Sequence, residues 1–149
     1  MDAPGQTADA WSASADGLPE DEDLMMQPTT PLAGRRILLV EDDYLLADAL
    51  AESLKTTGAT VFGPIGTVDD ALAAVSRLDG IEAVILDVNL DGRRVDAVAD
   101  AIRARGIPMV FVSGYDRELL PPRFADVPHC LKPVDIEQLS SALAAQLCE

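Results

Sequence analysis

The chain has 149 residues, 48% of them hydrophobic and only 4% aromatic, so it can build one domain around an aliphatic core. Its formal net charge of −15 argues against nucleic acid as a partner, because binding to phosphate backbones needs clustered Lys and Arg. An anionic membrane surface would repel the chain as well. The sequence has neither an apolar run long enough for a membrane span nor the start of a signal peptide. We therefore expect a cytoplasmic protein.

Residues 1–34 differ from the rest of the chain in charge and in pattern. They carry seven acidic residues, no basic residue, four prolines and three glycines, and they show neither a helical nor a strand period. Such a segment buries too little apolar surface to offset the entropy lost on ordering it. We predict a disordered acidic tail over 1–34 and a folded domain over 35–149. Met25 or Met26 is an alternative start of the chain.

The rest of the chain alternates between strand and helix patterns. Continuous aliphatic runs predict strands buried on both faces, and apolar residues three or four positions apart predict amphipathic helices. We expect strands at 36–40, 60–62, 83–86, 108–112 and 128–131, and helices at 44–57, 67–78, 95–105 and 135–147. A further helix before the fifth strand is interrupted by Pro121-Pro122, because proline disfavours helix at its own position and at the residue before it. The pattern predicts an α/β fold of (βα)5 units: a flavodoxin-like, doubly wound, five-stranded parallel sheet with strand order 2-1-3-4-5.

Two of the expected helices begin with a capping signal. Asp43 precedes the first helix, and Thr67 begins the second, with Asp70 three residues further on. Short polar side chains at such positions accept hydrogen bonds from the free backbone N–H groups of the first helical turn. We therefore expect Asp43 and Thr67 to serve as N-caps.

Polar side chains follow directly after four of the expected strands. Glu41 and Asp42 follow the first strand, Asp87 the third, Ser113 the fourth and Lys132 the fifth. Because ligands of such sheets bind at the carboxyl ends of the strands, we expect these side chains to share one crevice. Three neighbouring carboxylates repel one another unless a cation lies between them. Oxygen ligands without His or Cys favour Mg²⁺ as that cation.

This set of side chains suits phosphoryl transfer to a carboxylate. Asp87 is placed to act as the nucleophile, since carboxylates form aspartyl phosphates. Ser113 can donate a hydrogen bond to a phosphoryl oxygen, and Lys132 can supply a positive charge to it. Each residue alone has an ordinary explanation as a helix cap or an incidental strand-end residue. Their joint occurrence, each at an expected strand end, favours the functional interpretation.

Over residues 35–149 the chain resembles the receiver domain of bacterial two-component response regulators. The resemblance implies that Glu41 and Asp42 are the acidic pair that holds Mg²⁺, with Asp42 as a direct ligand. It implies that Asp87 is the phosphoryl acceptor and that the backbone carbonyl of Asn89 completes the metal site.

The same resemblance assigns roles to the residues after the last two strands. It implies that Ser113 is the hydroxyl that responds to phosphorylation, and that Lys132 is directed inward by a cis peptide bond to Pro133. The family usually has Tyr or Phe three residues before the lysine, as an aromatic switch, whereas this chain has His129. Because His129 lies in an expected strand, we expect it to pack in or at the rim of the core.

A smaller group within the family shares this departure. Residues 107–115 look like the Pro-Phe-x-Phe-Ala-Thr-Gly-Tyr signature of single-domain receivers of alphaproteobacteria, with Met109, Val112 and Ser113 replacing Phe, Ala and Thr. In that group the aromatic residue follows the fourth strand, so the resemblance implies that Tyr115 takes the switch role. The group is associated with the general stress response and with histidine kinases of the HWE and related classes.

Three functions are compatible with these residues. The first is a stand-alone receiver that accepts a phosphoryl group from a sensor histidine kinase or a phosphotransfer protein, and then signals by protein contact or serves as a phosphate sink or shuttle. The second is a haloacid-dehalogenase-like, Mg²⁺-dependent phosphatase, whose nucleophile follows the first strand in a DxD pattern that Glu41-Asp42-Asp43 does not match. The third is an adaptor that works without phosphorylation, which the presence of Asp87, Ser113 and Lys132 disfavours. We expect the first: a signalling protein whose only chemistry is its own phosphorylation and dephosphorylation.

Overall fold

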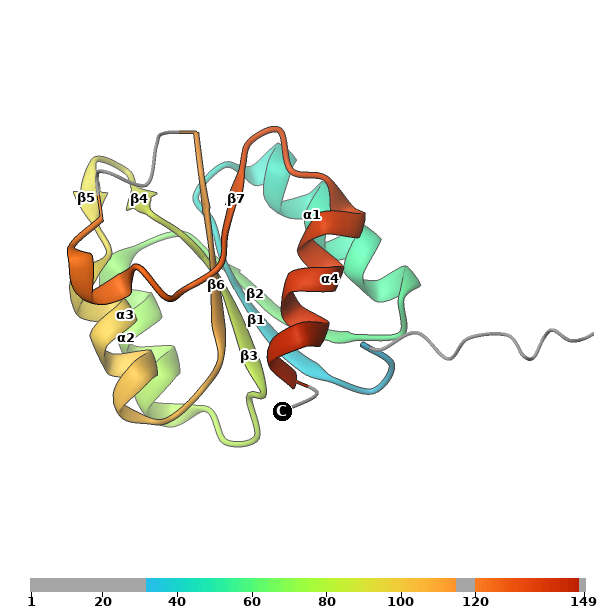
Figure 1. Ribbon diagram of the computed structural model, residues 1–149, viewed down its shortest axis with the longest axis horizontal. Coiled ribbons are helices and arrows are strands. Elements are labelled where there is room, and N and C mark those ends of the chain that lie inside the picture. Colours follow the sequence, from blue (N-terminus) through green and yellow to red (C-terminus); the bar gives the residue numbers. More distant parts are fainter. Residues whose placement is uncertain (1–31, 115–119, 148–149) are drawn as a thin grey trace, which may run out of the picture. The chain divides into compact units, whose positions relative to one another are not determined.

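The computed structural model describes residues 32–114 and 120–147 (Figure 1). The predicted tail therefore stays a prediction over residues 1–31, which lie outside the described part. Tyr115, the predicted switch residue, also lies outside it.

Five parallel strands form the central sheet. They are β1 (Arg36–Val40), β2 (Thr60–Ile65), β3 (Ala83–Asp87), β6 (Met109–Ser113) and β7 (His129–Leu131). Their order is β2-β1-β3-β6-β7, and every neighbouring pair is parallel. This order confirms the predicted doubly wound α/β fold, in which the first strand added after β1 and β2 pairs on the other side of β1.

Helices cover both faces of the sheet. They are α1 (Tyr44–Thr56), α2 (Val68–Arg77), α3 (Asp96–Ala104) and α4 (Ile136–Leu147). Figure 1 shows α2 and α3 together on one face, and α1 and α4 together on the other. None of the helices in the described part is long and apolar enough to cross a membrane.

Alternate residues of each strand enter two separate hydrophobic clusters. Leu38, Val84 and Phe111 belong to the cluster beneath α2 and α3. Ile37 and Ile85 belong to the cluster beneath α1 and α4. Successive side chains of a strand point to opposite faces, so a sheet covered on both sides needs apolar residues throughout. This requirement explains the continuous aliphatic runs in the sequence.

The two predicted N-caps are confirmed. The Asp43 carboxylate accepts hydrogen bonds from the backbone N–H groups of Leu45 and Leu46, at 3.0 and 3.2 Å. The Thr67 hydroxyl accepts one from the N–H of Asp70 at 3.1 Å. The first cap matters for the site, because it begins α1 directly after the polar residues that end β1.

The chain between β3 and α3 forms a hairpin, which the sequence analysis did not predict. Strands β4 (Asn89–Leu90) and β5 (Arg93–Arg94) pair antiparallel. The turn between them has positive φ at both central residues, 51° at Asp91 and 83° at Gly92. Two such residues are typical of a type I′ turn, which Asp-Gly sequences favour. The Asp-Gly pair was therefore the overlooked signal.

The connection between β6 and β7 departs from the (βα)5 pattern. Within the described residues 120–128, the chain forms one 3₁₀ turn, η3 (Pro122–Phe124), and no α-helix. Pro121 and Pro122 explain this, because proline has no N–H to donate and restricts the residue before it. The expectation of an interrupted helix was correct in position, but the described residues contain no α-helical turn.

The folded part begins earlier than predicted. Leu32 is only 1% exposed and packs in the cluster beneath α1 and α4. The turn that follows is closed by a hydrogen bond from Arg35 N to the Leu32 carbonyl and by another from Gly34 N to the Gly58 carbonyl. Residues 32–34 thus belong to the domain, although the sequence prediction placed them in the tail. An isolated apolar residue between Pro and Ala shows no periodicity, so its burial left no pattern to detect.

Strand β2 is longer than predicted. It continues through Gly63 and a cis peptide bond to Pro64, and ends at Ile65. Proline is tolerated here because β2 is an edge strand with a register shift against β1. Glycine is required at position 63, where φ is +103° and an added Cβ would lie 2.5 Å from the Leu39 carbonyl oxygen.

Candidate functional site

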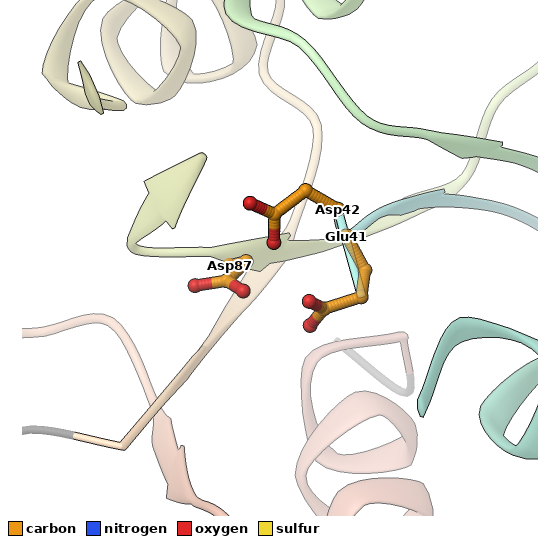
Figure 2. Close-up of side chains that lie close together, drawn as sticks. All are labelled: Glu41, Asp42 and Asp87. Carbon is orange, nitrogen blue, oxygen red and sulfur yellow. The ribbon is translucent and has the colours of Figure 1, made fainter. Parts of the chain in front are cut away.

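Three carboxylates meet at the carboxyl ends of two neighbouring strands. Glu41 and Asp42 follow β1, and Asp87 ends β3. One oxygen from each carboxylate lies within 4.8 Å of those of the other two, and Figure 2 shows the three side chains gathered at this edge. Glu41 and Asp87 are buried, at 3% and 4% exposure, whereas Asp42 is exposed. The structure thus brings together the three acidic residues that the sequence singled out.

The Lys132 side chain reaches this group from the edge of the sheet, because the residue follows the edge strand β7. Its Nζ atom lies 2.9 Å from Asp87 Oδ2 and 3.3 Å from Glu41 Oε1. The residue follows β7, and its peptide bond to Pro133 is cis. Its backbone N–H donates to the Ser113 carbonyl at 2.8 Å, which continues the pairing of β7 with β6 beyond the last strand residue. This backbone pairing therefore fixes the position of the Lys132 Cα atom, from which the side chain extends.

Ser113 ends the strand that lies between Asp87 and Lys132. The residue is 2% exposed, and it pairs in register with Leu131 of β7. Asp87 pairs with Val112, the residue before the serine. Ser113 is therefore placed at the same edge of the sheet as the carboxylates, as the sequence predicts.

Backbone N–H groups hold each of the three carboxylates. Glu41 Oε2 accepts a hydrogen bond from Asp43 N at 3.0 Å, and Asp87 Oδ1 accepts one from Asn89 N at 3.0 Å. Asp42 Oδ2 accepts one from Asp91 N at 2.7 Å, across 49 residues of sequence. Hydrogen bonds to an ionised acceptor are stronger than neutral ones. Sequence analysis assigned no role to Asp91, since a backbone donor leaves no side-chain signal.

The electrostatics of the site set Glu41 apart. Burial, together with the hydrogen bond and like charge of Asp87, raises the pKa of Glu41 to about 7. The Asp43 N–H and the charge of Lys132 oppose this rise without cancelling it. Burial by itself would lower the pKa of Lys132, but hydrogen bonding and attraction to Asp87 and Glu41 outweigh it and raise that pKa overall. The site therefore holds more negative charge than one ammonium group compensates.

The donor set fits a hard divalent cation such as Mg²⁺. All three side chains offer carboxylate oxygens, the ligand type that Mg²⁺ prefers. Glu41 Oε1 is buried and has no hydrogen-bond partner among the described residues, although it lies near the Lys132 ammonium. The Lys132 ammonium is shared with Asp87, so a second cation at the site would compensate the remaining negative charge.

His129 packs within the domain. Its ring is half-buried and meets the ring of Phe111 edge-on, with centroids 6.3 Å apart and planes at 75°. This agrees with the expected core or rim position. The structure therefore gives His129 a packing contact within the domain.

Comparison with known proteins identifies the class. No family model matches the chain. A fold match with 21% identity is a response regulator receiver domain protein (CheY-like) from Methanospirillum hungatei JF-1, with TM-score 0.68 over 78% of this chain and 95% of that one. The doubly wound sheet of this chain thus has the fold of that receiver domain.

Two relatives are similar in sequence as well. SdrG from Sphingomonas melonis Fr1 is 42% identical, with TM-score 0.68 over 76% of this chain and 97% of that chain. The BeF3-activated conformation of SdrG from Pseudomonas melonis Fr1 matches with TM-score 0.65 and 42% identity, over 77% and 98% of the two chains. The transcriptional regulatory protein PdtaR of Mycobacterium tuberculosis is 29% identical over 126 residues, which are 80% of this chain but 61% of PdtaR. The chain belongs to the receiver domains of response regulators.

Proposed function

We propose that the protein is a signalling receiver that accepts a phosphoryl group on Asp87 from the phosphohistidine of a sensor histidine kinase or of a phosphotransfer protein. The observation that carries the proposal is the position of Asp87. Its carboxylate is buried where β3 ends, close to the acidic pair and to the Lys132 ammonium. Asp87 is the carboxylate closest to that ammonium.

The chemistry follows from these neighbours. An oxygen of Asp87 forms a bond to phosphorus while the bond from phosphorus to the donor imidazole nitrogen breaks, and the imidazole then takes a proton from solvent. Lys132 lies within hydrogen-bond distance of Asp87 and is placed to neutralise negative charge on the arriving group. Ser113 would donate a hydrogen bond to a phosphoryl oxygen. Positioning and charge neutralisation are the main contributions that a protein makes to phosphoryl transfer.

A bound Mg²⁺ would complete the site. Asp42 and Asp87 would hold the ion, with Glu41 beside them and the backbone carbonyl of Asn89 as a further ligand. The ion would supply positive charge to the phosphoryl oxygens. Asp42 is the most accessible of the three carboxylates, which suits it to the first contact with an ion that arrives from solvent.

The output of the domain is a second part of the proposal. The resemblance to SdrG, at 42% identity, supports a receiver that responds to a beryllofluoride-type phosphoryl mimic, since SdrG has a BeF3-activated conformation. We propose that an HWE-class kinase is the donor, that the general stress response is the setting, and that Tyr115 changes position on phosphorylation. The phosphorylated domain then contacts a protein partner, or passes the phosphoryl group on as a sink or shuttle.

Phosphorylation of matched aspartate variants tests the assignment of Asp87. The wild type, Asp87→Asn and Asp79→Asn would be incubated with acetyl phosphate and Mg²⁺, and the phosphoprotein separated on a phosphate-affinity gel. Asp79 is fully exposed and, among the described residues, its side chain forms one long ion pair, with Arg105, so its variant controls for loss of charge. We expect phosphorylation of the wild type and Asp79→Asn, and none of Asp87→Asn. Normal phosphorylation of Asp87→Asn would contradict the assignment.

The same experiment, run beside an assay of simple phosphate esters as substrates, separates the alternatives. A folded wild type that takes up no phosphoryl group would favour an adaptor that works without phosphorylation. Repeated turnover of simple phosphate esters, without a stable phosphoprotein, would favour a phosphatase.

A further inference from the structure

The β4–β5 hairpin touches two of the three site carboxylates through its backbone. Asn89 N donates to Asp87 Oδ1 at 3.0 Å, and Asp91 N donates to Asp42 Oδ2 at 2.7 Å. The second bond is the shorter one and joins the turn of the hairpin to the end of β1. It therefore ties an exposed carboxylate, which would otherwise turn freely in solvent, to a particular point of the backbone.

The hairpin is itself well fixed. Leu90 is 1% exposed and packs in the cluster beneath α2 and α3. The Asn89 side chain closes the turn, because its Oδ1 accepts a hydrogen bond from Gly92 N at 2.8 Å. Asp91 can direct its N–H outward from the turn toward Asp42 because its φ is 51°, a left-handed conformation that Asp tolerates better than most residues. A hairpin with these anchors can orient a partner side chain.

The hydrogen bonds divide the carboxylate oxygens into two kinds. Each oxygen of Asp87 accepts one hydrogen bond, one from Asn89 N and the other from Lys132, and keeps a second lone pair that can bind an ion. Asp42 Oδ2 accepts from Asp91 N, and no described residue donates a hydrogen bond to Asp42 Oδ1. Oδ1 is therefore the oxygen of Asp42 with both lone pairs open to an ion.

We propose that the β4–β5 hairpin positions Asp42 for the divalent cation, with the Asp91 N–H fixing one carboxylate oxygen so that the other faces the metal. Asp91 and Gly92 are then positioning residues that raise the affinity for Mg²⁺ without contacting it. Groups that orient a metal ligand by hydrogen bonding commonly change metal affinity ten- to a hundredfold. The proposal rests on the proposed function, in that it takes Asp42 as a ligand of Mg²⁺.

Two glycines allow a matched test. Gly92 and Gly106 both have positive φ, 83° and 72°, and an added Cβ would meet nothing within 4 Å at either position. Replacing either with Ala therefore imposes similar backbone strain without a clash. Gly92 lies in the hairpin turn. Gly106 lies between α3 and β6, at the amino-terminal ends of the strands and so away from the carboxylates. Only Gly92→Ala should disturb the bond between Asp91 and Asp42.

Mg²⁺ binding to the full-length protein would be measured by calorimetry for the wild type, Gly92→Ala and Gly106→Ala, together with each melting temperature. We expect the two variants to melt at similarly reduced temperatures, with Mg²⁺ affinity at least threefold weaker in Gly92→Ala and within twofold of wild type in Gly106→Ala. Equal affinity in all three proteins, or equal weakening in both variants, would overturn the positioning role while leaving the metal site in place. A wild type that binds no Mg²⁺ would overturn the metal site itself, and the positioning role with it.

Amide hydrogen exchange tests the bond directly. The Asp91 N–H should exchange at least tenfold faster in Asp42→Ala than in the wild type. The Gly92 N–H, which is bonded to Asn89 Oδ1 within the hairpin, should exchange within twofold of its wild-type rate. An unchanged rate at Asp91 would show that the bond to Asp42 does not form in solution and would refute the proposal.

Discussion

Lys132 and Asp87 come from strands that do not touch, yet Lys132 Nζ lies 2.9 Å from Asp87 Oδ2. Strand β6 separates β3 from β7, so the lysine side chain passes across the end of β6 to reach the aspartate. Ser113 ends that intervening strand. The ion pair therefore crosses the place where a phosphoryl group on Asp87 would meet both the serine hydroxyl and the ammonium group.

Removing the lysine should destabilise the cation-free protein. Lys132→Ala leaves the buried Glu41 and Asp87 carboxylates without their only ammonium partner in the described structure. Loss of one partner of a largely buried ion pair costs about 1–3 kcal/mol, and chemical denaturation in chelator would measure it. The exposed helix residue Lys55, changed to Ala, serves as the control and should shift stability by less than about 0.5 kcal/mol. Equal effects of the two variants would show that Lys132 is not coupled to the carboxylates.

Mg²⁺ should stabilise the fold. A ligand that binds only the folded state adds about 2.7 kcal/mol when its concentration is a hundredfold above the dissociation constant. We expect millimolar Mg²⁺ to raise the melting temperature of the wild type, and Asp42→Ala to reduce the rise. Asp48→Ala, an exposed change on α1, should retain the full effect. A melting temperature of the wild type that does not change with Mg²⁺ would count against the proposed Mg²⁺ site.

The raised pKa of Glu41 predicts a pH dependence of stability without divalent cations. A carboxyl group with a raised pKa binds its proton more tightly in the folded than in the unfolded protein. Its contribution to stability is therefore present below the ordinary value of 4.5 and is lost as pH rises through about 7. In chelator, the melting temperature of the wild type should fall between pH 5 and pH 8, and that of Glu41→Gln should fall less. Added Mg²⁺ should oppose the fall, since it favours the charged carboxylate. An equal fall in the wild type and Glu41→Gln would show that protonation of Glu41 is not its cause.

Much of the fold could be predicted because the sheet is buried on both faces. The aliphatic runs around Ile37, Ile85 and Val110 are the direct consequence of that burial, and the helix caps have their own short signals. The polar residues at the strand ends could be predicted as a group, since topology alone brings Glu41 and Asp87 to one edge. That inference needs no side-chain geometry.

What the sequence analysis missed lies in backbone conformation and in isolated contacts. The bond from Asp91 N to Asp42 depends on a left-handed turn residue and joins positions 49 residues apart. Leu32 is one apolar residue without a periodic neighbour, so its burial could not be inferred from spacing. The chain around Pro122 could be predicted not to be regular helix, but the 3₁₀ turn there is held by tertiary contacts. Arg123, for example, pairs with Asp100 of α3, and Arg103 of α3 stacks over Phe124.

Leu32 should matter to stability although it lies beside the predicted tail. Its side chain is almost fully buried against the cluster beneath α1 and α4. Truncation of a buried Leu to Ala costs about 2–5 kcal/mol, so Leu32→Ala should unfold at clearly lower denaturant concentration. Leu45, which is 85% exposed, supplies the matched control, and Leu45→Ala should change stability by less than about 0.5 kcal/mol. A small effect of Leu32→Ala would show that the domain begins after residue 34, as the sequence suggests.

Tyr115, and not His129, should carry the response to phosphorylation. The His129 ring is packed edge-on against Phe111 within the domain, so His129→Ala should lower stability but leave the response largely intact. Tyr115 follows Ser113 by two residues, and a hydroxyl drawn toward the phosphoryl group would move the chain that carries it. A ligand shifts a two-state element only through contacts that differ between the states. Saturating beryllofluoride with Mg²⁺ should therefore cause amide chemical-shift changes that reach β7 in the wild type and in His129→Ala, but are reduced there in Tyr115→Ala. Changes that survive in Tyr115→Ala and vanish in His129→Ala would assign the switch to the histidine instead.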